Sequence, residues 1–144
     1  PPVPPVNLAY RKQAKLLSLD GTHELQVNGG VHFPRLGVDG HLDTVALAGG
    51  EWPWTYEVDL VDTADVQRIK VTFGSGYATH FEFRLSADGA NWQAVASKTD
   101  HDGTPFEATF DRVKARYVRL CALKPDGPEQ PGAQMSVAEL EVYE

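Results

Sequence analysis

The chain has 144 residues, of which 42% are hydrophobic and 23% charged, an ordinary composition for one globular domain that can bury a core. The 20 acidic residues against 13 basic ones give a formal net charge of -7, which argues against binding to nucleic-acid phosphates or anionic lipid. A single cysteine excludes an internal disulfide, and no apolar run is long enough to span a membrane.

The chain begins with PPVPPV, a composition typical of a semi-rigid polyproline linker. We therefore predict a linker over residues 1–6 and a folded domain over 7–144, both belonging to a longer protein. Up to about residue 50 the pattern is irregular and predicts loops with two short strands and a helical turn. Long loops on a rigid scaffold are where binding residues usually lie.

Within this irregular part, the stretch LGVDGHLDT (36–44) places a glycine on each side of Asp39. Glycine lets the backbone curl, so that carboxylate and carbonyl oxygens can point at one centre. Calcium binds about six to eight such oxygens. The stretch offers the Asp39 carboxylate, the Thr44 hydroxyl and carbonyl, and carbonyls near Leu36 and His41. A metal-free Asp-Gly turn is the simpler alternative, and the spacing of an EF-hand is absent.

Two loops carry aromatic residues that suit an exposed sugar platform. In GGEWPWTY we expect Trp52 outside and Trp54 packed under the sheet. In GSGYATH we expect Tyr77 and His80 at the tip of a strand connection, with local packing of Tyr77 and solvation of His80 as the alternative. Further polar candidates, each with a surface role as the alternative, are Glu51, His32, Arg35 and His101.

From residue 55 onward apolar and polar residues alternate, which predicts half-buried antiparallel strands. In 66–74, for example, Ile69, Val71 and Phe73 share one face. The predicted strand segments are 55–62, 66–74, 80–89, 91–97, 105–110, 116–123 and 136–144. Short strands separated by Asp-Gly and Pro-rich turns favour an all-β sandwich or jelly roll, with Cys121 buried as a small apolar side chain.

Six motifs occur in an order that resembles the F5/8 type C, or discoidin-like, domain, and most closely bacterial family 32 carbohydrate-binding modules. They are NLA (7–9), VDGHLDT (38–44), YEVDL (56–60), LSADGANWQAVA (85–96), KARYVRL (114–120) and AELEVYE (138–144). The resemblance implies a galactose-binding-like jelly-roll β-sandwich of two antiparallel sheets. It also implies that Trp92 is the buried core tryptophan of the family.

Many relatives hold one structural calcium between this early loop and the final strand. Carried over by resemblance, the ligands here are the Leu36 carbonyl, the Asp39 carboxylate, the His41 carbonyl, the Thr44 hydroxyl and carbonyl, the Ala138 carbonyl and the Glu139 carboxylate. The sequence departs from galactose-binding members, because the loop after Thr44 lacks their histidine and GSGYATH lacks their arginine and asparagine. Galactose is therefore not the expected ligand.

We find no catalytic motif such as HExxH, GxSxG, a P-loop or CxxC. The expected function is a noncatalytic carbohydrate-binding module that targets a larger secreted or cell-surface protein, a glycoside hydrolase or an adhesin, to glycans. Its expected partners are a glycan and other domains of the same parent chain. The alternatives are a protein or lipid adhesion module and a structural spacer without a sugar site.

Overall fold

The computed structural model describes residues 5–25, 33–47, 54–74, 76–124 and 136–144, and the regular secondary structure of these residues is almost entirely β. The elements are β1 (Gln13–Ser18), η1 (Pro34–Gly37), β2 (Ala46–Leu47), β3 (Trp54–Phe73), β4 (His80–Ser86), β5 (Gln93–Lys98), β6 (Phe106–Lys124) and β7 (Ser136–Tyr143). Two short strands and a helical turn in the first part of the chain were predicted, and β1, β2 and η1 confirm them. Among these elements no helix is long and apolar enough to cross a membrane.

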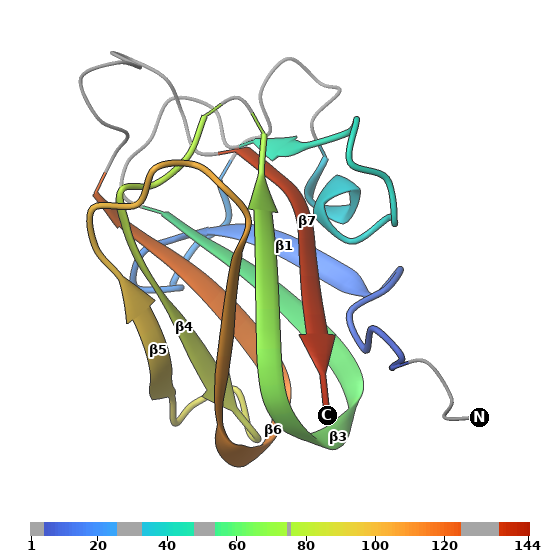
Figure 1. Cartoon of the computed structure of the whole chain (residues 1–144). Coiled ribbons are helices and arrows are strands. Elements are labelled where there is room, and N and C mark those ends of the chain that lie inside the picture. Colours follow the sequence, from blue (N-terminus) through green and yellow to red (C-terminus); the bar gives the residue numbers. More distant parts are fainter. Residues whose placement is uncertain (1–4, 26–32, 48–53, 75, 125–135) are drawn as a thin grey trace.

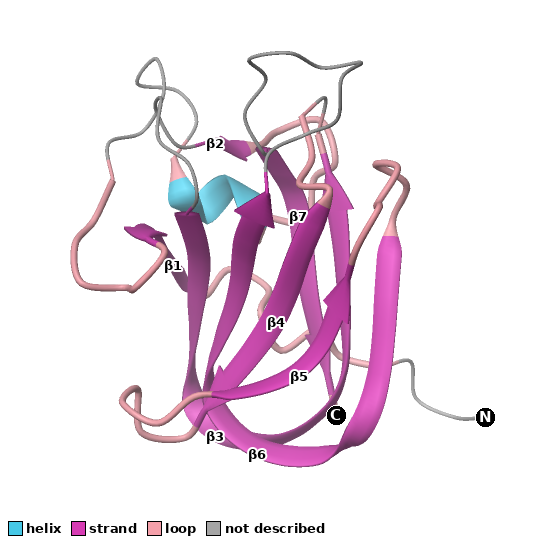
Figure 2. Cartoon of the chain, turned by 90° about the vertical axis from the view of Figure 1, so that its left-hand side faces the viewer, coloured by secondary structure: helices cyan, strands magenta, loops and turns pink. Residues whose placement is uncertain are grey.

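Two long antiparallel strands, β3 and β6, run through both layers of a β-sandwich (Figure 1). The strand order is β2-β7-β3-β6-β4-β5, and β1 pairs with β3. The first half of β3 pairs with β1 and with the second half of β6, whereas its second half pairs with β7 and with the first half of β6. Both strands curve at the lower end of the molecule, so that one hydrogen-bonded network forms two packed layers (Figure 2). The predicted antiparallel sandwich is confirmed.

The sequence predicted two strands, 55–62 and 66–74, where the structure has the single bent strand β3, and it likewise predicted 105–110 and 116–123, which both belong to β6. The residues between the two β3 segments are mostly polar, but the backbone continues through a register shift between Asp59 and Ala64. Val61 has φ 75° at this bend, and its amide donates a 2.8 Å hydrogen bond to Asp59 Oδ1. A positive φ is a strained conformation for a β-branched residue.

Replacing Val61 by glycine is expected to raise the free energy of unfolding by about 1 kcal/mol. Glycine adopts positive φ without strain, and the Val61 side chain is 54% exposed, so that little packing is lost. Val61→Ala is the control, since alanine keeps the Cβ that causes the strain. Urea denaturation of the three proteins measures the difference, and equal stability of the glycine and alanine variants would contradict the strain.

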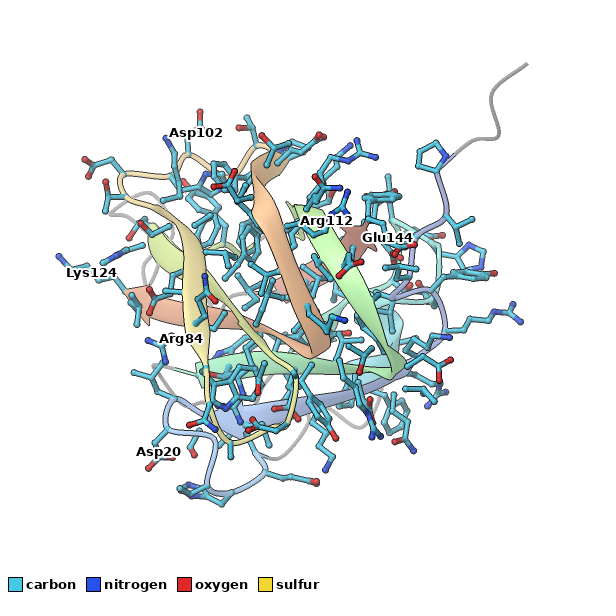
Figure 3. The ribbon with its side chains drawn as sticks, turned by 90° about the horizontal axis from the view of Figure 1, so that it is seen from below. Asp20, Arg84, Asp102, Arg112, Lys124 and Glu144 are labelled. Atoms are coloured by element: carbon cyan, nitrogen blue, oxygen red, sulfur yellow. The ribbon has the colours of Figure 1, made fainter. Side chains whose placement is uncertain are left out.

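The alternating residues of the strands fill the space between the layers. Phe81 and Phe83 are fully buried there, and so are Ile69 and Val71, which the period-two pattern predicted to share one face. Trp54 is 0% exposed, which confirms its predicted inward position. Seen from below, side chains of both layers meet in this space, while the labelled Asp102 and Lys124 point away from it (Figure 3).

Cys121 is also buried, as predicted, although it lies on the opposite side of β6 from the core residue Leu120. The Thr55 hydroxyl contacts its Sγ at 3.7 Å, and burial raises the pKa of the thiol. A buried, protonated thiol is a poor nucleophile, which fits a packing role.

Trp92 was expected in the core, and this prediction is wrong. The side chain is half-buried on the outer face, where the Arg119 guanidinium carbon lies 3.8 Å from the centroid of its ring. The Tyr117 ring lies beside it with a centroid distance of 6.5 Å. Trp92 immediately precedes the edge strand β5 and is absent from the buried core cluster. A cation–π contact and an aromatic neighbour therefore cover the indole instead of core packing.

Candidate functional site

The early loop that follows η1 is anchored by buried contacts, which position Asp39. The Tyr56 hydroxyl donates a 2.6 Å hydrogen bond to the Pro34 carbonyl, and the Arg11 amide donates to the Val38 carbonyl at 2.7 Å. A Cβ at Gly37 would lie 2.4 Å from the Tyr56 hydroxyl oxygen, so only glycine fits here. The first glycine before Asp39 thus allows a close approach between loop and sheet.

The second glycine, Gly40, connects this loop to the closing strand β7. Its φ of +82° lies in the left-handed region, which glycine adopts readily. Its amide faces the Glu139 carboxylate and lies 3.2 Å from each of the two oxygens. Asp39 and Glu139 therefore lie close together, although most strands of the sheet lie between them in the sequence.

Asp39 is itself held by its own loop. Its Oδ1 accepts a 3.0 Å hydrogen bond from the His41 amide, and its Oδ2 accepts a 2.6 Å hydrogen bond from the Thr44 hydroxyl. The same hydroxyl lies 3.4 Å from the His41 carbonyl oxygen. The Asp39 carboxylate, the Thr44 hydroxyl and the His41 carbonyl oxygen thus lie close together in this loop.

The electrostatics of this cluster favour a cation. Glu139 is only 4% exposed, and burial together with the neighbouring Asp39 raises the pKa of its carboxyl to about 7. Within the described residues, neither Glu139 nor Asp39 forms an ion pair with Lys, Arg or His. Burial and the same two carboxylates also raise the pKa of Tyr56. A buried carboxylate without a counter-charge is unfavourable unless it is protonated or binds a cation.

The donor set suits a hard cation. The part of the chain that the structure describes holds no group of three or more His, Cys, Asp or Glu side chains that could bind a metal. Any ion here would be bound by the two carboxylates together with hydroxyl and carbonyl oxygens, which is an oxygen-only set of the kind calcium prefers. Ala138, the other residue expected from β7, is 1% exposed and precedes Glu139 on that strand.

The connection between β3 and β4 lies at the same end of the sandwich as the Asp39 loop. The Gly74 amide donates to the Ser136 carbonyl at 2.7 Å, and a Cβ at Gly74 would lie 2.8 Å from the Val45 side chain. His80 begins β4 and is half-buried opposite Lys124. The structure therefore brings the predicted aromatic connection and the predicted metal loop to one end, which we call the loop end.

The Tyr77 ring is half-buried and packs edge-on against the His101 ring, with a centroid distance of 5.9 Å. The Gly103 backbone also lies against it, since a Cβ there would be 2.7 Å from the ring. Local packing of Tyr77, the alternative weighed from the sequence, is thus present. Part of the side chain remains accessible, and a role in ligand binding stays a prediction.

His101 was expected at the surface, but it is 4% exposed. Phe73, Phe81 and Phe106 surround its ring at centroid distances of 5.4, 5.1 and 6.1 Å, and Tyr77 lies on a further side. Burial lowers the pKa of His101. In the folded protein this imidazole is therefore uncharged near neutral pH.

His101 is expected to weaken the fold in acid. The unfolded chain takes up a proton on this ring as the pH falls below about 6.5, while the folded protein resists it, so the free energy of unfolding falls as the pH drops from about 6.5 to the lowered folded pKa. Urea denaturation at about pH 7.5 and about pH 5.5, roughly one unit on either side of 6.5, measures how much stability is lost in acid. We expect this loss to be smaller in His101→Phe than in wild type. His23→Phe, at an exposed histidine, serves as the control. An equal loss in wild type and His101→Phe would contradict this role.

The remaining predicted ligand residues divide into two groups. Arg35 is exposed on η1, and its guanidinium carbon lies 4.9 Å from the centroid of the Phe33 ring. Trp52, Glu51 and His32 lie outside the described residues. No interaction between described residues joins Arg35 to Tyr77 or His80.

A second polar cluster was not predicted from the sequence. Glu57 and Arg119 lie on the outer face of the sheet in an open depression of about 490 Å³. Their alternation with buried neighbours is visible in YEVDL and RYVRL. Which outward residue of one strand faces which of the next depends on register, and the sequence contains no local signal for it.

Fold and loop geometry define a galactose-binding-like β-sandwich. The family model of the NedA-like, galactose-binding domain, in the F5/8 type C group, matches residues 36–120. Since the match covers more than half of the chain, the protein belongs to this family. The expected galactose-binding-like fold is thereby confirmed. No curated protein matches the chain.

Solved structures that resemble the chain include modules that bind carbohydrates. Chitosan-binding module 1 of a chitosanase/glucanase from Paenibacillus sp. IK-5 is 27% identical, with a TM-score of 0.83 and coverage of 96% of this chain and 99% of that one. Module 2 of the same enzyme, solved with chitotriose, is also 27% identical, with a TM-score of 0.83 and coverage of 96% and 100%. A CBM32 module from Clostridium perfringens, solved with GalNAc-β-1,3-galactose, shares the fold at 23% identity, with a TM-score of 0.78 and coverage of 96% and 100%.

Proposed function

We propose that this domain is a noncatalytic carbohydrate-binding module whose glycan site lies at the loop end. The observation that carries the proposal is the likeness, over nearly the whole chain and at 27% identity, to two chitosan-binding modules of one enzyme. The loop end gathers the Asp39 loop, the Tyr77 connection and the start of β7 around one surface. Of the predicted contacts, the structure describes Tyr77 and His80, which are half-buried, and Arg35, which is exposed.

Within this function, we favour glucosamine-containing oligosaccharides over neutral galactosides. A polymer of glucosamine carries protonated amines, and this chain carries a formal net charge of -7. An acidic protein attracts such a cationic polymer at long range and raises its local concentration. The residues that galactose-binding members use are missing from the corresponding loops of this sequence.

A structural calcium at the loop end is the second part of the proposal. Asp39 and Glu139 would hold it with the Thr44 hydroxyl and carbonyl and with the carbonyls of Leu36, His41 and Ala138. Bound calcium would neutralise the two carboxylates and fix the early loop against β7. The support for it is the buried Glu139 carboxylate, which lacks a cationic partner among the described residues.

The module would act by targeting the protein to which it belongs. A single small site binds weakly, with a dissociation constant from about millimolar to micromolar. Tethered through a linker such as PPVPPV, even weak binding raises the effective concentration of a partner domain at the glycan surface. A secreted or cell-surface parent, with the glycan outside the cell, fits this use.

Isothermal titration calorimetry with glucosamine trisaccharide, its N-acetylated form and galactose tests the function. We expect binding of the glucosamine form, lost or at least about tenfold weaker in Trp52→Ala and Tyr77→Ala. Tyr143→Ala is the matched control, because Tyr143 ends β7 far along the strand from the loop end. Absence of binding to any sugar, with binding of a protein or of vesicles instead, would favour an adhesion module and overturn the proposal.

A further inference from the structure

We propose that this domain carries a second saccharide site on the outer face of the sheet, centred on Arg119 and Glu57 and separate from the loop end. It goes beyond the proposed function and shares with it only the class of ligand. The site takes a sugar through two neighbouring hydroxyl groups, between the edge of the Arg119 guanidinium and Glu57 Oε2.

A row of charged side chains crosses four adjacent strands at this place. Lys15 on β1 is the register partner of Glu57 on β3, Glu57 is the partner of Arg119 on β6, and Arg119 is the partner of Arg84 on β4. Neighbouring residues along these strands, such as Val58 and Leu120, are fully buried in the core. Alternation therefore places the whole row on the outer face.

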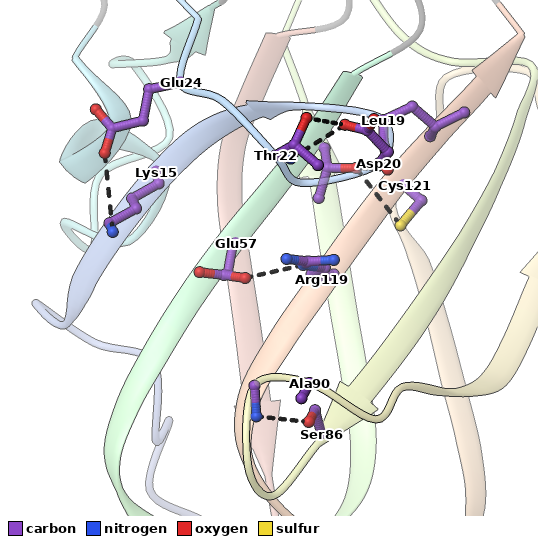
Figure 4. Close-up of polar contacts among 12 residues, drawn as sticks. Lys15, Leu19, Asp20, Thr22, Glu24, Glu57, Ser86, Ala90, Arg119 and Cys121 are labelled. Atoms are coloured by element: carbon purple, nitrogen blue, oxygen red, sulfur yellow. Dashed lines mark hydrogen bonds and ion pairs between the residues drawn. The ribbon is translucent and has the colours of Figure 1, made fainter.

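Two turns make three members of this row, Lys15, Glu57 and Arg119, the floor of a depression rather than part of a flat face. The turn after β1 and the turn after β4 stand on either side, and the open volume between them is about 490 Å³. Figure 4 shows Glu57 and Arg119 together on the sheet, between the turn of Asp20 and Thr22 and the turn of Ser86 and Ala90. The lining residues include Leu17, Gly21, His23, Gly89 and Tyr117.

The Arg119 guanidinium is fixed in orientation. It contacts the Trp92 ring at 3.8 Å, and a Cβ at Gly21 would lie 2.5 Å from one of its terminal nitrogens. Gly21 has φ +76°, and the turn brings its backbone against the end of the Arg119 side chain. The Arg119 side chain is 12% exposed and that of Glu57 is 15% exposed. A guanidinium held in this way needs little further ordering when it binds.

A second Arg–carboxylate pair on the same two strands shows what is unusual about this one. Arg116 binds Asp59 through two hydrogen bonds, of 2.9 and 3.0 Å, which use both carboxylate oxygens. Arg119 binds Glu57 through Nε and Oε1 alone, at 2.8 Å. Within the described part of the chain, no other hydrogen bond uses the Arg119 terminal nitrogens or Glu57 Oε2. The pair in the depression thus keeps donors and an acceptor available side by side.

Neighbouring donors and an acceptor suit adjacent hydroxyl groups, because each hydroxyl both donates and accepts. The Arg119 edge would donate to one hydroxyl, and Glu57 Oε2 would accept from the next. Leu17 and Tyr117, also in the lining, provide apolar surface for the C–H face of a sugar ring. The lining holds the carboxylates of Glu24, Glu57 and Asp88 against the cations of Lys15 and Arg119, which disfavours an anionic ligand.

Nuclear magnetic resonance titration of the whole isotope-labelled chain with glucosamine trisaccharide, cellotriose and galactose, each to about 10 mM, tests this site. We expect at least one sugar to cause saturable shifts of the Thr22, Gly89 and Arg119 amides. Arg119→Lys keeps the charge but loses the planar fork, and it should weaken binding at these amides at least about tenfold. Arg112→Lys, at an exposed position of β6, is the matched control and should bind as wild type does.

The wild-type titration tests the site even if Arg119→Lys does not fold. Glu57→Gln is a second variant, for which we expect the same loss of sugar binding. No shift of the three amides with any sugar, or unchanged affinity in both variants, overturns the second site. Shifts confined to residues 33–44 would leave the proposed loop-end function standing without it. Shifts confined to the outer face would remove the loop-end function and leave this site.

Discussion

Calcium at a hundredfold excess over its dissociation constant is expected to raise the free energy of unfolding by about 2.7 kcal/mol. The reason is that only the folded chain brings the Asp39 loop and the buried Glu139 carboxylate together, through the Gly40 amide. In the unfolded chain these groups lie far apart and bind the ion poorly. Thermal or urea denaturation with calcium and with a chelator measures the effect.

Asp39→Asn is expected to abolish this calcium dependence, because it removes one of the two carboxylates. Asp43→Asn is the matched control, since Asp43 is an exposed carboxylate of the same loop, and the same charge is removed. Calcium should stabilise the Asp43 variant as it stabilises wild type. If calcium leaves the stability of the wild type unchanged, or stabilises the Asp39 variant equally, the loop does not bind the ion at this place.

Truncation of Phe81 to alanine is expected to lower the free energy of unfolding by about 3–5 kcal/mol. Phe81 is fully buried between the layers, and Phe73, Phe83 and Phe106 lie around it at centroid distances of 5.3, 5.9 and 5.4 Å. These rings come from three strands, so the space left cannot close without moving both layers. The loss is a large fraction of the stability of an ordinary domain.

Urea denaturation of Phe81→Ala and wild type measures this loss. Val6→Ala provides the comparison, because the Val6 side chain is 69% exposed and should change the stability by less than about 0.5 kcal/mol. A loss below about 1 kcal/mol for Phe81→Ala would mean that the aromatic cluster does not join the layers as the structure has it.

The site residues illustrate how far a single sequence leads. The two glycines around Asp39 predicted a curled loop, and the structure gives each a separate reason: a close approach to Tyr56 at Gly37 and a left-handed backbone at Gly40. The link from this loop to Glu139 was reached only through family resemblance, because the residues themselves contain no sign of a contact across the whole chain. Trp52 and Glu51 remain predictions outside the described residues.

The sequence by itself determined most strand segments, the residues that share an inward face, such as Ile69 and Val71, and the buried thiol, because alternation and side-chain polarity act within a few residues. Only the tertiary structure joined 55–62 with 66–74 in β3, and 105–110 with 116–123 in β6. It also turned Trp92 outward against Arg119. It alone also set Glu57 beside Arg119. Register, strand bending and the partners of an outward side chain arise from contacts between distant segments, and no local pattern specifies them.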